Sequence, residues 1–70
     1  MKYTIDHLNA NILVQDIDHT VYLFDGNRVA LVPDCCGSSY YHVIVNGKTI
    51  ATRCTFYNGQ RKALAYLNAR

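Results

Sequence analysis

The cysteines are the first residues of this chain that could carry out chemistry. Cys35 and Cys36 are adjacent and Cys54 stands apart, an odd number with no metal-ligand spacing. A nucleophilic cysteine would need a histidine beside it, with His42 as the candidate, and no basic residue neighbours the adjacent pair in the sequence. We therefore expect reduced thiols, with Cys54 as a small buried apolar residue. A disulfide from Cys54 to one of the adjacent pair is the less favoured alternative.

A second candidate is the cluster of Asp16, Asp18 and His19, whose side chains are of types that bind metals. Alternation along a strand would place the two aspartates on one face and the histidine on the other. No second cluster completes a site, and the chain has neither a glycine-rich phosphate loop nor a Ser-His-Asp arrangement. The sequence predicts a protein that is not an enzyme, with no catalytic, metal or cofactor site.

The composition is that of one small folded domain. Seventy residues predict a single domain over residues 1–70, and 50% hydrophobic with 17% charged residues is too apolar for a disordered chain. A net charge of +2 leaves protein and nucleic-acid partners open but excludes an acidic mimic of DNA. The chain has no apolar run of about 18 residues and no signal-peptide core at its start. We therefore expect a cytoplasmic protein with no membrane partner.

The clearest structural signal is Asn46-Gly47, which lies between two runs rich in β-forming residues. This dipeptide favours a type I′ turn and predicts a hairpin. The turn sets the expected cross-strand pairs: Val45 with Lys48, Ile44 with Thr49, Val43 with Ile50, His42 with Ala51, Tyr41 with Thr52, and Tyr40 with Arg53. Alternation then predicts a core face of Tyr41, Val43, Val45, Ile50 and Cys54, leading to Phe56. The outward face carries Tyr40, His42, Ile44, Thr49, Ala51, Arg53 and Thr55.

The remaining segments complete an α+β fold. Residues 19–24 and 28–32 predict a second hairpin, with Asp25-Gly26 or Gly26-Asn27 as its turn and Pro33 ending the second strand. Residues 12–17 predict another strand, and residues 3–8 a short strand or a turn. Asn58 is the expected N-cap of a helix over residues 60–70, whose apolar stripe of Ala63, Leu64 and Leu67 should dock on the core face. The expected architecture is an antiparallel sheet of four or five strands built from two hairpins, with one C-terminal helix packed on one face.

The outward face of the first hairpin is the expected contact surface. Tyrosine and arginine often dominate binding energy at interfaces, and both occur there. Basic residues at the start of the helix could extend this surface. The partner-binding residues predicted from the sequence are Tyr40, His42, Thr49, Arg53, Tyr57, Arg61 and Lys62.

Residues 39–69 carry a recognisable pattern. It consists of Val43, Val45, Asn46-Gly47-Lys48, Ile50 and Phe56, followed by a helix with Ala63, Ala65 and Tyr66. This resembles the integrase-type DNA-binding module of phage integrases, homing endonucleases and plant ethylene-response factors. The resemblance implies a sheet that enters the major groove of DNA through outward Arg and Trp side chains. This chain offers Arg53 on that face and no tryptophan, which ranks nucleic-acid binding second.

The small size and the strand–turn–strand–helix order are also similar to those of the α+β inhibitors that bacteriophages use against host systems, anti-CRISPR proteins among them. That resemblance implies a non-catalytic protein that sterically blocks a larger protein or ribonucleoprotein complex of the host cell. We predict this function, with a small sheet-based DNA- or RNA-binding domain as the alternative. A homodimer formed through exposed sheet edges is a third option.

Overall fold

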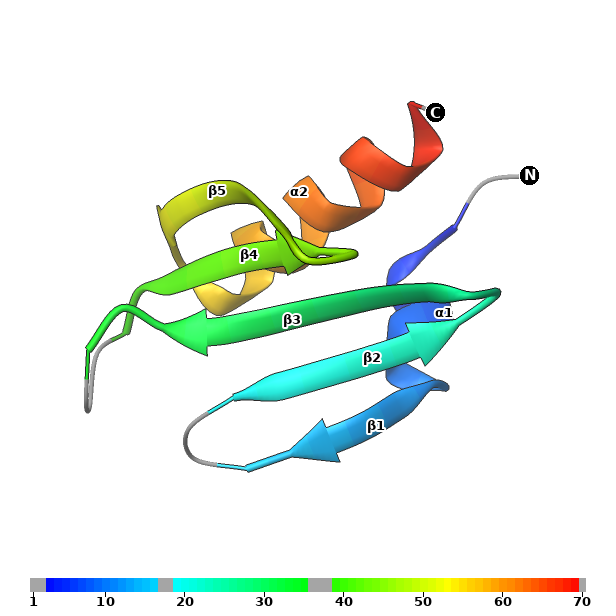
Figure 1. Ribbon diagram of the computed structural model, residues 1–70, viewed down its shortest axis with the longest axis horizontal. Helices are drawn as coiled ribbons and strands as arrows, with labels where there is room; N and C mark the ends of the chain where they lie inside the picture. Colours follow the sequence, from blue (N-terminus) through cyan, green and yellow to red (C-terminus); the bar gives the residue numbers. More distant parts are fainter. Residues whose placement is uncertain (1–2, 17–18, 36–38, 70) are drawn as a thin grey trace.

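A computed structural model describes residues 3–16, 19–35 and 39–69 of the chain. Its centre is an antiparallel sheet of five strands in the order β1-β2-β3-β4-β5 (Figure 1). The strands are β1 (Ile12–Gln15), β2 (Thr20–Phe24), β3 (Asn27–Pro33), β4 (Tyr41–Val45) and β5 (Lys48–Cys54). The helices are α1 (Ile5–Asn9) and α2 (Phe56–Asn68). The expected α+β class, the antiparallel sheet and its C-terminal helix are confirmed.

Both helices cover the same face of the sheet, the far face in the view of Figure 1. Helix α2 packs mainly on β4 and β5, whereas α1 packs on β2 and against α2. Between the helices and the sheet lies one apolar core, made of Leu8, Tyr22, Phe24, Val29, Leu31, Val43, Val45, Cys54, Ala63, Leu64 and Leu67. The stripe predicted for α2 is therefore buried as expected. Neither helix of the described residues has the length and apolarity needed to cross a membrane.

Two tight turns shape the sheet, and both were predicted. Asn46 and Gly47 have φ values of 52° and 85°, the left-handed conformations that a type I′ turn requires. Asp25 and Gly26 have φ values of 50° and 76°, so Asp25-Gly26 is the turn and Gly26-Asn27 is not. Pro33 is the last residue of β3, as its missing N–H group predicted.

The pairing of β4 with β5 departs from the expected register after the first two pairs. Val45 lies opposite Lys48 and Ile44 opposite Thr49, as predicted. The pairs beyond them are Val43 with Ala51 and Tyr41 with Cys54, where Ile50 and Thr52 were expected. Each displacement is a β-bulge, with one extra residue in β5. The uniform register predicted from the turn is therefore wrong for the outer part of this hairpin.

The bulges in β5 change which side chains point inward. Ile50 and Ala51 are consecutive, yet both pack against the core, an arrangement that strict alternation forbids. Ala51, which was expected on the outward face, is thus turned to the core. Arg53 has a positive φ of 55°, and Cys54 after it is again buried. Figure 1 shows β5 curling out of the plane of the sheet, as bulged strands do, and so leading into α2.

The start of α2 and the presence of α1 both differ from the sequence prediction. Helix α2 begins at Phe56 because the side chain of Thr55 accepts a hydrogen bond from the Asn58 N–H at 3.4 Å. Thr55 is therefore the N-cap, and the assignment of Asn58 is wrong. The strand or turn expected over residues 3–8 is also wrong, since this segment contributes to α1. That helix is held by Leu8, which is 0% exposed in the core.

The cysteines that the structure describes are both free thiols. Cys35 is exposed and Cys54 is buried, and Cys36 lies outside the described residues. The Sγ atom of Cys54 lies 3.5 Å from the Thr52 carbonyl oxygen, to which it donates a hydrogen bond. Cys54 is thus the small buried apolar residue that the sequence predicted.

Candidate binding surface

The face of the sheet opposite the helices carries a mainly aliphatic row, in which Val21 is buried and the other residues are partly or fully exposed. Cross-strand pairing aligns this row over all five strands: Val14, Val21, Ala30, Ile44 and Thr49. Ala30 lies between the core residues Val29 and Leu31 in β3, so alternation points it away from the helices. Leu23 on β2 adds an apolar side chain that is 47% exposed. We call this surface the open face.

Four of the predicted partner-binding residues lie at the β4–β5 side of the open face. Tyr40 is 45% exposed, and the guanidinium carbon of Arg53 lies 5.7 Å from the centre of its ring, a cation–π contact. His42 pairs with Val32 of β3, and its Nε2 atom lies 3.2 Å from the Asp34 Oδ1 atom. Thr49 is exposed. The structure therefore brings Tyr40 and Arg53 together, next to a half-buried His42–Asp34 pair.

The other three predicted residues, Tyr57, Arg61 and Lys62, lie on α2. All three are exposed, whereas Gly59, Gln60, Ala63 and Leu64 of the same helix are buried against the rest of the protein. The guanidinium carbon of Arg61 lies 5.7 Å from the centre of the Tyr57 ring. These residues therefore face away from the sheet. The structure places the seven predicted residues on two different sides of the molecule.

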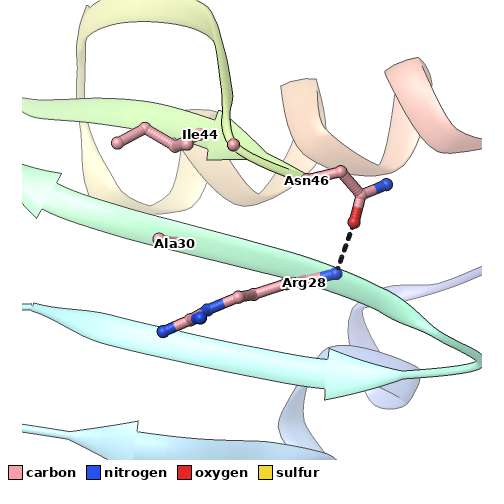
Figure 2. Close-up of a pocket in the computed structure, with 5 residues that line it drawn as sticks. Arg28, Ala30, Ile44 and Asn46 are labelled. Carbon is pink, nitrogen blue, oxygen red and sulfur yellow. Dashed lines mark hydrogen bonds between the residues drawn. The ribbon is translucent and has the colours of Figure 1, made fainter.

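A hollow on the open face was not foreseen from the sequence. It measures about 420 Å³ and is lined by Arg28, Ala30, Ile44, Asn46 and Gly47 (Figure 2). The Arg28 N–H donates a hydrogen bond to the Asn46 Oδ1 atom at 2.8 Å, and the Asn46 N–H donates to the Arg28 carbonyl at 2.8 Å. These bonds join the β4–β5 turn to the start of β3. The available signal was the position of Arg28 directly before buried Val29, which alternation turns outward.

Charge is divided unequally along the chain. Residues 1–34 contain five acidic and two basic residues, a net charge of −3, whereas residues 35–70 contain five basic residues and no acidic one, a net charge of +5. The second segment forms β4, β5 and α2, which lie together at one side of the sheet. That side of the protein therefore favours anionic partners.

The Asp16 and His19 side chains do not lie on opposite faces of a strand, as alternation had suggested. The His19 Nδ1 atom lies 3.8 Å from the Asp16 Oδ1 atom, because both residues flank the connection between β1 and β2 and are not part of a strand. Asp18 lies outside the described residues. Within the part of the chain that the structure describes, no group of three or more His, Cys, Asp or Glu side chains is arranged to hold a metal ion.

No known protein family, curated protein or solved structure matches this chain. The open face itself is therefore the basis for assigning a function. Tyr40 lies directly before β4 and four positions before Ile44, and a strand rises about 3.3 Å per residue, so the backbones of these two residues lie about 13 Å apart. The open face thus offers a hollow lined by Ala30, Ile44 and Arg28 and, separate from it, the Tyr40–Arg53 pair.

Proposed function

We propose that this chain is a non-enzymatic binding protein that occupies a working surface of a larger protein or ribonucleoprotein complex in the host cytoplasm. Small phage and mobile-element inhibitors, such as anti-CRISPR proteins, act in this way. The observation that carries the proposal is the open face, a mainly aliphatic row across the strands, with Arg28 on one side of it along the strand direction and the Tyr40–Arg53 pair on the other. Such a surface suits steric occupation, because a protein partner can cover it without any chemical step.

The physical properties of the open face support this proposal. Covering apolar surface contributes about 25 cal/mol per Å², and Leu23, Ala30 and Ile44 offer such surface. Buried tyrosine and arginine side chains are common energetic anchors of interfaces. The sheet is held from behind by the packed core, so little conformational freedom would be lost when a partner binds.

We expect Ile44→Arg to abolish the capture of a host complex by the purified protein. The substitution places a long charged side chain on the aliphatic row, where a partner would have to desolvate it, and we expect at least about a tenfold loss of affinity. The measurement is affinity capture from host lysate with identification by mass spectrometry, followed by titration of the captured complex. Ala65→Arg adds the same side chain to the exposed surface of α2 and serves as the matched control.

A second variant tests the other end of the open face. Tyr40→Ala combined with Arg53→Gly removes the cation–π pair, and glycine accepts the positive φ at position 53. We expect weaker capture from this variant as well, with an unchanged circular dichroism spectrum. Capture that survives both changes would show that the partner does not use the open face.

Nucleic-acid binding is the second candidate function, favoured by the +5 charge of residues 35–70 and by their resemblance to the integrase-type module. A salt titration with duplex DNA separates the two candidates. Binding driven by phosphate contacts should weaken by orders of magnitude between about 50 and 200 mM salt. Under the leading proposal, affinity for the captured complex changes little over the same range, because apolar contacts at the open face dominate it.

A further inference from the structure

The hollow on the open face is lined by two aliphatic side chains, those of Ala30 and Ile44, and by one charged side chain, that of Arg28. Ala30 of β3 and Ile44 of β4 are cross-strand partners and both line the hollow. Figure 2 shows the Arg28 side chain extending from β3 toward β2 along one border. Asn46 and Gly47 of the β4–β5 turn form the opposite border.

The Asn46 amide at this border is already engaged within the protein. Its Oδ1 atom accepts a hydrogen bond from the Arg28 N–H at 2.8 Å, and its Nδ2 atom donates to the Asn27 Oδ1 atom at 3.2 Å. Asn46 therefore shapes the hollow more than it offers hydrogen bonds to a ligand. The Arg28 guanidinium is left as the principal polar group that a ligand could meet.

The Arg28 guanidinium has no carboxylate partner among the described residues. The ion pairs formed by those residues are His19–Asp16 and His42–Asp34, and neither includes Arg28. Lys48 is exposed but is the cross-strand partner of the core residue Val45, so its side chain points to the other face of the sheet and Arg28 is the cation at the hollow. Asp25 is the nearest acidic residue along the chain, and its carboxylate is not within 4.0 Å of the guanidinium. The charge at the hollow is thus complementary to an anion.

From these features we infer that the hollow receives an acidic segment of a partner protein in which an apolar side chain lies beside a carboxylate. The apolar side chain contacts Ala30 and Ile44, and the carboxylate accepts paired hydrogen bonds from the Arg28 guanidinium, whose planar fork matches it. This inference rests on the proposed function and specifies the chemistry of the partner.

The lining of the hollow favours such a segment over nucleic acid. Proteins that bind single strands stack bases on aromatic rings, whereas the side chains that line this hollow are aliphatic or polar. Tyr40 does not line the hollow, and its backbone lies about 13 Å from that of Ile44, by the strand rise of about 3.3 Å per residue. An aliphatic floor suits a leucine, isoleucine or methionine side chain from a protein.

Selection from a random dodecapeptide display library on the immobilised protein tests this inference. We expect the selected peptides to be enriched in Asp or Glu next to a large apolar residue. Ile44→Arg should weaken the binding of these peptides by at least about tenfold. Arg28→Glu should reverse their preference, so that a second selection on this variant yields Lys or Arg in place of the acidic residue. Lys48→Glu makes the same charge change on the other face of the sheet, because Lys48 is the cross-strand partner of the core residue Val45, and it should leave the selection unchanged.

Three results would overturn the inference. They are selected peptides without carboxylates, peptides that bind Ile44→Arg as tightly as the unmodified chain, and the same acidic preference after Arg28→Glu. A random single-stranded DNA library should be selected in parallel at about 150 mM salt, near physiological ionic strength. If binders that depend on Ile44 come from the DNA library and not from the peptide library, the inference is overturned. If host-complex capture depends on Ile44 while the peptides show no acidic preference, the proposed function stands and this inference falls.

Discussion

Leu31→Ala is expected to unfold most of the protein at room temperature. Leu31 is 0% exposed and lies in β3, the central strand, under α2. A leucine-to-alanine change in a core costs about 3–5 kcal/mol, and a core of this size rarely supplies more than about 3–5 kcal/mol in total. Urea denaturation followed by far-ultraviolet circular dichroism measures the loss. In the extreme case, Leu31→Ala is already unfolded without urea and shows no cooperative unfolding transition.

Leu23→Ala is the matched control, because it makes the same change on the other face of the sheet. Leu23 is 47% exposed, and we expect its truncation to cost at most about 1 kcal/mol. Equal losses for the two variants would contradict the assignment of an open face and would indicate that a second copy of the chain covers it. Sedimentation over a range of concentrations would then reveal the dimer.

The two leucines illustrate which features of the fold can be predicted from the sequence and which cannot. Asn46-Gly47 predicts one type I′ turn, and Asp25-Gly26 or Gly26-Asn27 predicts a second, because few other dipeptides accept φ > 0 at both positions. These local signals were sufficient for the two hairpins that form β2 to β5, whereas the order of all five strands is known only from the structure. They did not determine which face of the β2–β3 hairpin is covered, since Val21, Leu23, Tyr22 and Phe24 are all apolar. The positions of the helices decide that question.

The bulges of β5 and helix α1 could not be predicted for a different reason. A bulge at Ile50 is favourable because Ile50 and Ala51 both reach the core, a benefit that appears only once α2 is in place. Helix α1 has only five residues, too few for a helical period to be visible. Its stability derives from tertiary contacts of Leu8, as expected for helices this short.

The candidate site was predicted only in part. Alternation predicted outward positions for Tyr40, His42 and Arg53; Arg53 is exposed, but it follows two β-bulges and has a positive φ, so uniform alternation does not explain its position. Arg28 was missed because its connection to Asn46 joins residues eighteen positions apart and depends on the pairing of β3 with β4. The absence of acidic residues after Asp34 was visible in the sequence and could have directed attention to the basic side of the sheet.

Tyr22→Phe is expected to remove a buried polar contact and with it a dependence of stability on pH. The Gln60 Nε2 atom donates a hydrogen bond to the Tyr22 hydroxyl at 2.9 Å, and both residues are buried. Loss of the hydroxyl leaves a buried amide donor without this partner, at a cost of about 1–3 kcal/mol near neutral pH. Gln60→Leu should be harmful for the same reason. The double change should cost less than the two single changes added together.

The high-pH part of this prediction follows from the pKa of Tyr22. Burial raises the pKa of its hydroxyl above the ordinary 10.0, while the hydrogen bond with Gln60 lowers it in part. Above pH 10 the unfolded chain therefore loses this proton while the folded chain still holds it, so stability falls as the pH rises toward the folded pKa. Below pH 9 this contribution is fully present. The free energy of unfolding should thus fall less steeply above pH 10 for Tyr22→Phe than for the unmodified chain.

The comparison isolates Tyr22 because the other five of the six tyrosines are present in both proteins. Their ionisation contributes to both pH profiles and cancels in the difference to first order. Urea denaturation at a series of pH values between about 8 and 11, spanning the ordinary tyrosine pKa, provides the two profiles. Parallel profiles would mean that the Tyr22 hydroxyl ionises as readily in the folded chain as in the unfolded one. The hydroxyl would then not be enclosed between α2 and the sheet, and the covered face would have to be reassigned.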